Sequence, residues 1–170
     1  MAINKICESF KAAVSGIKDG STILVSGFGG AGMPTELLNA LREQGASELT
    51  IVSNNAGVGK EGIGGLLLDG RVKKVICSYP RSGGSVVFEE MWAAGKVDLE
   101  VVPQGTLSER IRAAGAGIGG FYTPTGVGTQ LAEGKEVREI NGRLQVLEAP
   151  LKGDVAFISF SYTHLRAHET

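Results

Sequence analysis

Residues 19–34 read DGSTILVSGFGGAGMP. The continuous apolar run Ile23–Val25 predicts a short strand that is covered on both faces. Glycines follow at positions 27, 29, 30 and 32, where the chain must turn sharply and can let a ligand approach its backbone. Pro34 has its φ preset for the first turn of a helix that we expect to run through Arg42. A strand, a glycine loop and a helix N-terminus together predict a site for a phosphate, a carboxylate or an oxyanion.

The glycine loop leaves two other interpretations open. Gly27, Gly29 and Gly32 fit the dinucleotide pattern G-x-G-x-x-G,. The acidic residue that this pattern requires about 20 residues further on is missing, because the next expected strand leads into Asn54-Asn55,. The glycines could also serve only a tight turn between a strand and a helix.

Composition narrows the class of protein. The chain has 170 residues, 42% of them hydrophobic and 21% charged, with a formal net charge of −1. This predicts one domain with a substantial core, and argues against disorder and against nucleic-acid binding. Cys7 and Cys77 are far apart and have no metal-ligating neighbours, so we expect neither a disulfide framework nor a metal site. We expect no signal peptide, no membrane span and a cytoplasmic location.

Strand and helix patterns alternate along the chain. Strands are expected at 23–25, 49–52, 72–77, 97–102 and 154–158, and helices at 4–17, 34–42, 66–68, 85–94 and 107–114. This order predicts an α/β fold, a three-layer open and mostly parallel sheet with flanking helices. Ligands of such sheets bind at the carboxyl ends of the strands, which selects one candidate rim: residues 26–32, 54–57, 78–84 and 104–106.

Residues 115–129 differ in composition and periodicity from the residues before them. They form a glycine-rich stretch without helical or strand periodicity, and a loop of this length in a compact domain is usually functional. The two runs that follow, 136–140 and 143–147, flank Asn141-Gly142, which predicts a β-hairpin.

Residues able to do chemistry are scarce. The only histidines, His164 and His168, fall in the final dozen residues, so the usual histidine-based catalytic arrangements are absent from the body of the chain. Ser53 and Ser78 have no recognisable activating base. Gln104 follows a proline at the end of an expected strand, where its amide could donate to an oxyanion or could simply tie down a loop. The chain therefore resembles half of an active site.

Several motifs match one family in order and spacing. They are residues 19–34, 53–57, 101–112, 121–129, 133–136 and 146–148. Over residues 3–158 the chain resembles the alpha subunit of family I CoA-transferases, with Ser26 at a position where the family usually has glycine. We expect residues 1–158 to form a CoA-transferase alpha-subunit domain that is incomplete at its C-terminus. We expect residues 159–170, which resemble translated sequencing adaptor, to be a non-native tail.

The resemblance implies a two-subunit enzyme, an α2β2 heterotetramer, that moves CoA from succinyl-CoA to a 3-oxo acid by ping-pong chemistry. The nucleophilic glutamate would lie on the beta subunit, and CoA would be a substrate with no further cofactor and no metal. Gln104 matches a residue of the oxyanion hole, and Asn54 and Asn55 match a polar pair that lines the site. The segment that the resemblance assigns to CoA binding is Ser26, Gly27, Phe28, Gly29, Gly30, Ala31 and Gly32.

The substrate is a separate question. Residues 77–81, CSYPR, are similar to 3-oxoadipate CoA-transferases more than to acetoacetate-type relatives. Arg81 is our hypothesis for the cation that meets the second carboxylate, although an ordinary surface arginine fits as well. The competing function is a non-catalytic α/β module that binds CoA or a nucleotide.

Overall fold

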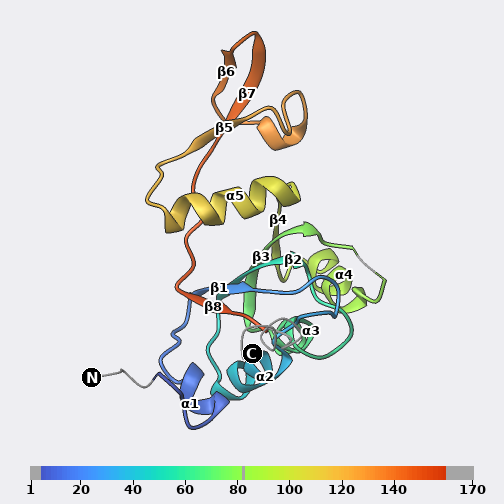
Figure 1. Ribbon diagram of the computed structural model, residues 1–170. Helices are drawn as coiled ribbons and strands as arrows, with labels where there is room; N and C mark the ends of the chain where they lie inside the picture. The colour runs from blue at the N-terminus through green and yellow to red at the C-terminus, as the bar shows by residue number, and fades with distance from the viewer. Residues whose placement is uncertain (1–4, 82, 160–170) are drawn as a thin grey trace, which may run out of the picture.

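A five-stranded parallel sheet forms the centre of the molecule (Figure 1). The computed structural model describes residues 5–81 and 83–159. The strands are β1 (Thr22–Val25), β2 (Leu49–Asn55), β3 (Val72–Tyr79), β4 (Asp98–Val101) and β8 (Val155–Phe157), in the order β4-β3-β2-β1-β8. All four pairings between neighbours are parallel, as the alternation of strands and helices predicted.

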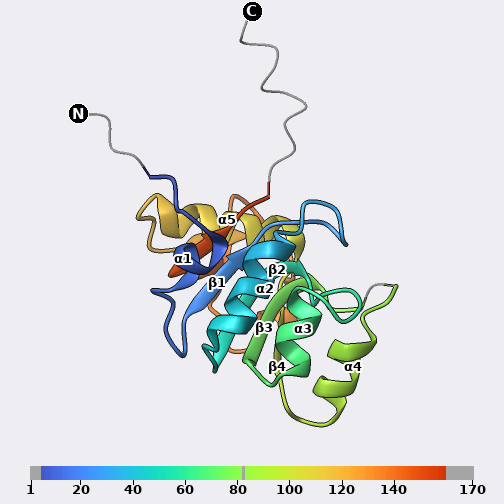
Figure 2. The same ribbon diagram turned by 90° about the horizontal axis from the view of Figure 1, so that it is seen from below.

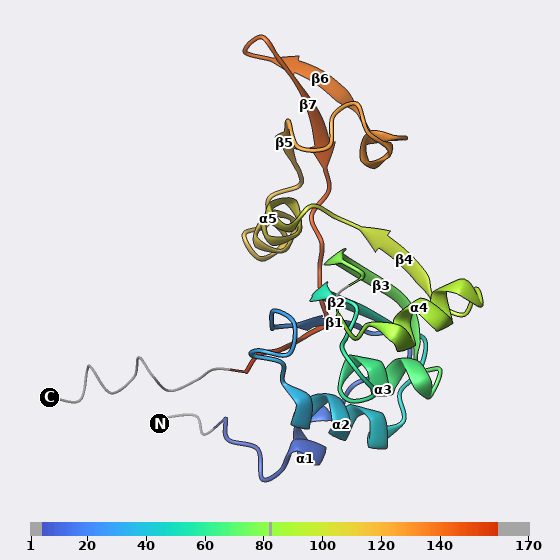
Figure 3. The same ribbon diagram turned by 90° about the vertical axis from the view of Figure 1, so that its right-hand side faces the viewer.

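Helices cover both faces of this sheet. Successive residues of a strand point to opposite faces, and the β1 residues Ile23 and Leu24 belong to different apolar clusters. The cluster of Ile23 also contains side chains of α1 (Phe10–Val14), α2 (Thr35–Gln44), α3 (Ile63–Leu68) and α4 (Val86–Ala93). Figure 2 shows α1 to α4 on the face of the sheet that is turned toward the viewer. Figure 3 shows α5 (Gln104–Gly115) on the opposite face of the sheet from these four helices. The predicted three-layer fold is confirmed.

A small antiparallel sheet lies beyond α5, away from the main sheet (Figures 1 and 3). It consists of β5 (Phe121–Thr123), β6 (Val137–Ile140) and β7 (Arg143–Glu148), and the 3₁₀ turn η1 (Gln130–Ala132) lies between β5 and β6. The predicted hairpin is confirmed: Asn141 and Gly142 have φ of 52° and 74°, as a two-residue hairpin turn requires. The expectation that 115–129 holds no strand was wrong, because β5 is defined by its pairing with β7 and not by a local pattern.

Two helices differ from their predicted bounds. The helix expected over 4–17 is confined to Phe10–Val14, where the Ser9 hydroxyl accepts the Ala12 N–H at 3.1 Å. Ile6 is 86% exposed, so the apolar pattern before Phe10 does not become part of the buried core. Helix α5 begins three residues earlier than expected, because Pro103 is its N-cap and the Pro103 carbonyl accepts the Leu107 N–H at 2.8 Å. Because Gly105 has a low helix propensity, the sequence pattern did not predict this first turn.

Charged side chains fasten α5 to both sheets. Glu100 of β4 accepts hydrogen bonds from Lys74 of β3 at 2.6 Å and from Arg110 of α5 at 2.8 Å. Arg110 Nε also donates to the Ala149 carbonyl at 2.9 Å, and its side chain is only 11% exposed. Within the small sheet, Lys135 of the loop before β6 donates to the buried Glu148 of β7 at 2.7 Å. This network fixes the position of α5, and therefore of its first residue, Gln104.

The structure describes only the first residue of the expected non-native tail, residues 159–170. Ser159 is described, whereas residues 160–170, with His164 and His168, lie outside the described residues. Within 5–81 and 83–159, no helix combines the length and the apolar character that crossing a membrane requires.

Candidate functional site

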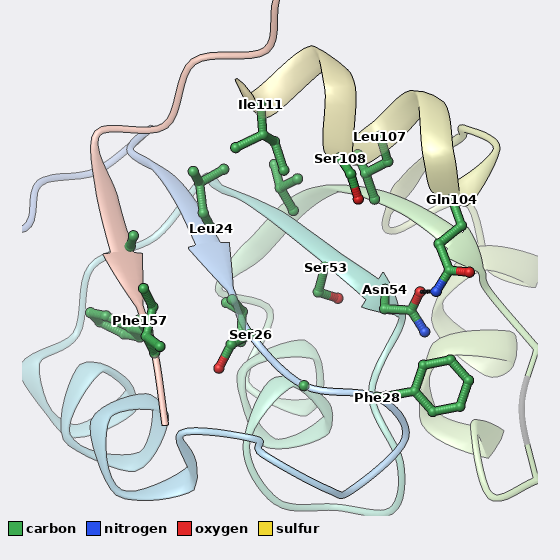
Figure 4. Close-up of a pocket in the computed structure, with 15 residues that line it drawn as sticks. Leu24, Ser26, Phe28, Ser53, Asn54, Gln104, Leu107, Ser108, Ile111 and Phe157 are labelled. Carbon is green, nitrogen blue, oxygen red and sulfur yellow. Dashed lines mark hydrogen bonds between the residues drawn. The ribbon is translucent and has the colours of Figure 1, made fainter. Parts of the chain in front are cut away.

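A cavity of about 420 Å³ opens between α5 and the carboxyl-terminal halves of strands β1, β2 and β8 (Figure 4). From β1 the chain moves to β2, β3 and β4 on one side, and later returns to place β8 on the other side of β1. The strand order thus reverses at β1, and ligands of open α/β sheets bind at this kind of reversal. The cavity therefore lies where the topology predicts a binding site.

The lining of the cavity is apolar at one end and polar at the other. Leu24 and Val52 of the sheet face Leu107 and Ile111 of α5. The polar side chains of the lining are Ser26, Ser53, Asn54, Gln104 and Ser108. No charged side chain is among the described residues that line this cavity.

Gln104 and Asn54 meet at the polar end. Gln104 is the first residue of α5, and Asn54 is the sixth residue of β2. Gln104 Nε2 donates a hydrogen bond to Asn54 Oδ1 at 2.8 Å, as Figure 4 shows. The two residues are 50 positions apart in the sequence, and the parallel sheet brings them together because β2 and β4 end at the same edge.

The glycine loop is a tight hairpin. Phe28 and Ala31 exchange two backbone hydrogen bonds, at 2.9 and 3.2 Å, and Phe28 is 66% exposed at the mouth of the cavity (Figure 4). Gly27 has a φ of +119°, and a Cβ there would lie 3.2 Å from Ala31 O and Met33 N. Only glycine fits this position. Because α2 begins at Thr35, the loop turns back before the helix instead of leading straight into it.

Ser26 joins the carboxyl end of β1 to the glycine loop. Its φ is not positive, so a serine is accommodated without strain. Its hydroxyl donates to the Gly32 carbonyl at 2.9 Å and accepts the Ser159 N–H at 3.1 Å. Ser26 therefore holds both ends of the glycine hairpin beside the residues that follow β8.

The expected site residues do not all line the cavity. Five of them do: Ser26, Gly27, Phe28, Asn54 and Gln104. Five others are not among its lining: Gly29, Gly30, Ala31, Gly32 and Asn55. Asn55 is buried, and its side-chain amide accepts the Gly57 N–H at 2.9 Å and donates to the Gly29 carbonyl at 3.3 Å. Through its hydrogen bond to Gly29, Asn55 stabilises the glycine hairpin.

Arg81 stands apart from this group. It follows β3, is exposed to solvent and is not among the residues that line the cavity. Its proposed contact with a substrate carboxylate therefore stays a prediction.

The hydroxyl and thiol groups near the rim are unsuited to act as nucleophiles. Ser53 donates its hydroxyl hydrogen to the Asn55 carbonyl. Burial raises the pKa of the Cys77 thiol to about 12, so the thiol stays protonated and packs as a small apolar side chain. Ser78 is not part of the lining. Among residues 5–81 and 83–159, no group of three or more His, Cys, Asp or Glu is arranged to hold a metal ion.

Ser108 was not among the expected site residues. Its side chain faces the cavity from α5, one turn after Gln104 (Figure 4). The signal was available in principle, because residues four apart share one face of a helix. It was obscured because the helix was expected to begin only at Leu107.

Comparisons with known proteins agree with this architecture. A family described as Coenzyme A transferase matches residues 7–164. The chain is 62% identical to the A-type subunit of 3-oxoadipate CoA-transferase from Pseudomonas putida, over 92% of this chain and 68% of that protein. It is 51% identical to the A-type subunit of succinyl-CoA:3-ketoacid coenzyme A transferase from Xanthomonas campestris, over 87% of this chain and 61% of that protein.

A solved structure is similar as well. An acyl-CoA transferase of Escherichia coli O157:H7, in a thioester complex with CoA, superimposes with a TM-score of 0.74 at 26% identity. The match covers 88% of this chain and 33% of that one. The chain thus spans about two thirds of the length of its relatives in Pseudomonas and Xanthomonas, and a third of the Escherichia protein.

Proposed function

Because the chain belongs to the coenzyme A transferase family, we propose that it is the alpha subunit of an enzyme that moves CoA from succinyl-CoA to a 3-oxo acid. The favoured acceptor is 3-oxoadipate, since the relative with 62% identity carries that name. Acetoacetate is the second choice. The reaction is ping-pong, and its nucleophile is a glutamate of a partner beta subunit.

One observation carries the proposal: the cavity offers amide and hydroxyl groups but no nucleophile. Asn54 and Gln104 place amide groups at its mouth, and no described lining residue is charged. A site built in this way can stabilise an oxyanion but cannot attack a thioester. A partner chain that supplies a carboxylate would complete it.

Gln104 acts on the charge that develops during each transfer. The partner's glutamate attacks the thioester carbonyl of succinyl-CoA, the carbonyl oxygen becomes an oxyanion, and the CoA thiolate leaves as an acyl-glutamyl anhydride forms. The thiolate then attacks the glutamyl carbonyl and releases succinate, which leaves a glutamyl-CoA thioester. The 3-oxo acid reverses these steps and departs as its CoA thioester. Amide N–H donors that point at each oxyanion are worth about 10²–10³ in rate.

The remaining binding roles fall to the loop and the rim. We assign CoA binding to residues 26–32, the glycine hairpin whose exposed Phe28 stands at the cavity mouth. The second carboxylate of 3-oxoadipate would extend outward to Arg81, since the lining itself holds no cation among its described residues. CoA is a substrate here, and the reaction as proposed needs no cofactor and no metal.

The proposed setting follows from the bacterial relatives. We place the enzyme in the cytoplasm as an α2β2 assembly, since the relatives named as A-type subunits are proteins of Pseudomonas and Xanthomonas. Nucleic acid is not proposed as a partner, because the formal net charge is −1,.

The test is reconstitution with a glutamate-bearing beta subunit. The chain alone should form no 3-oxoacyl-CoA from succinyl-CoA, and the mixture should form it. Gln104→Ala should then lower kcat by roughly 10²–10³-fold. Gln130→Ala is the matched control, because this glutamine is exposed and lies outside the cavity.

The results separate the enzyme from a binding module. If the mixture binds CoA but never forms product, or if Gln104→Ala changes only the affinity for CoA, the non-catalytic module is correct. If Gln130→Ala is as damaging as Gln104→Ala, the effect is not specific to the cavity.

A further inference from the structure

The Ser108 hydroxyl faces the cavity without a partner. Of the hydroxyl groups that line the cavity, Ser26 donates to the Gly32 carbonyl and Ser53 to the Asn55 carbonyl. Ser108 makes no side-chain hydrogen bond within residues 5–81 and 83–159. A free hydroxyl on the wall of a binding cavity is available to a ligand.

The surroundings of Ser108 select a neutral ligand group. Its neighbours along the lining are the apolar side chains of Leu107 and Ile111 on α5 and of Leu24 and Val52 on the sheet. An ionised carboxylate at this wall would find no cation among the described residues that line the cavity. A neutral carbonyl oxygen needs none, because one hydroxyl donor satisfies it.

The spacing from Gln104 fits a 3-oxo acid. Ser108 lies one helical turn beyond Gln104, roughly 6 Å along the axis of α5 at 1.5 Å per residue. The two carbonyl oxygens of a 3-oxo acid are roughly 3–5 Å apart by ordinary bond lengths. The spacing of the two residues along α5 is thus comparable to the separation of the two oxygens that a 3-oxo acid presents to them.

We propose that Ser108 donates a hydrogen bond to the 3-oxo group of the acceptor and thereby selects 3-oxo acids over saturated acids. This inference rests on the proposed function and adds a specificity residue to it. It also gives Gln104 and Ser108 different roles in the site. Gln104 stabilises the reacting centre, which every substrate has, whereas Ser108 contacts an oxygen that succinate and saturated acids lack.

Kinetics of the reconstituted complex test this division. Ser108→Ala should lower kcat/KM for acetoacetate by about tenfold, mainly through KM, which is the expected effect of one lost hydrogen bond. Butyrate, the saturated analogue, should bind as a competitive inhibitor with nearly the same Ki in both proteins. The KM for succinyl-CoA should change by at most about twofold, and Ser108→Thr, which keeps a hydroxyl, should restore most of the selectivity.

Each outcome has a definite meaning. If Ser108→Ala weakens acetoacetate and butyrate equally, or leaves acetoacetate unaffected, Ser108 does not recognise the 3-oxo group. If the KM for succinyl-CoA rises by the same factor, the substitution has disturbed α5 instead. A wild-type complex that transfers no CoA at all would overturn the proposed function, and binding of acetoacetate against butyrate would then test Ser108 by itself.

Discussion

Gln104 Nε2 donates to Asn54 Oδ1 over 2.8 Å, which links the first residue of α5 to the end of β2. A free glutamine side chain has several rotamers, and this bond holds its amide nitrogen on the side of the cavity. The second N–H of the same nitrogen remains for a ligand. Asn54 is thus placed to orient the donor that stabilises the oxyanion.

Asn54→Ala should lower kcat by about tenfold in the reconstituted complex, because the Gln104 amide loses the bond that orients it. Gln104→Ala should cost about 10²–10³-fold. If Asn54 acts through Gln104, the double variant should be no slower than Gln104→Ala alone. Effects that multiply fully would mean that Asn54 contacts the substrate independently.

Arg81→Ala should raise the KM for 3-oxoadipate about tenfold and leave the KM for acetoacetate within about twofold, since only the first substrate has a second carboxylate. Steady-state kinetics with both acceptors measure this. Arg143→Ala is the control, because Arg143 is exposed on β7 and far from the cavity. Equal changes for the two acceptors would refute the assignment.

Much of this site could be predicted from local sequence patterns. What could not be predicted depends on contacts between segments that are far apart in the sequence. The strand, glycine loop and helix of residues 19–44 each have a local signature, and so does the hairpin at Asn141-Gly142. The family resemblance pointed to Gln104 and Asn54. Their mutual hydrogen bond depends on how β2 and β4 end at one edge of the sheet, which no local pattern contains.

The failures have a common cause. The helix expected over 4–17 has the right spacing of apolar residues, but Ile6 is exposed and outside the core, and packing decides helix stability. Strand β5 exists only because β7 pairs with it. Asn55 follows Asn54 in sequence, yet its buried side chain bonds the glycine hairpin and does not line the cavity. Each outcome was set by tertiary contacts.

The two cysteines should react very differently. Cys7 is exposed, whereas Cys77 is buried and its thiol has a pKa raised to about 12, so only about 10⁻⁴ of it is thiolate at pH 8. Iodoacetamide at pH 8 should alkylate one thiol per native chain, and mass spectrometry of peptides should locate it at Cys7. Both should react in urea. Rapid labelling of Cys77 in the native protein would contradict its burial.

Acid should weaken the network that holds α5. Burial alone would raise the pKa of Glu100, but the hydrogen bonds from Lys74 and Arg110 outweigh it and lower the pKa below its ordinary value of 4.5. A carboxylate whose pKa is depressed by folding stabilises the protein above its unfolded pKa, and this stabilisation is lost as the pH falls through the folded value. The loss therefore lies below about pH 4.5.

Glu100→Gln should lower the free energy of unfolding by roughly 1–2 kcal/mol at pH 7, since two charge-assisted hydrogen bonds become neutral ones. Urea titrations followed by far-UV circular dichroism measure this difference from pH 7 down to pH 3.5. The difference should shrink below pH 4.5, because the wild-type carboxyl group then becomes neutral as well. Glu133→Gln, at an exposed glutamate, should show no such trend. A constant difference across the whole range would mean that the charge of Glu100 does not contribute, and that packing alone holds α5 above the cavity.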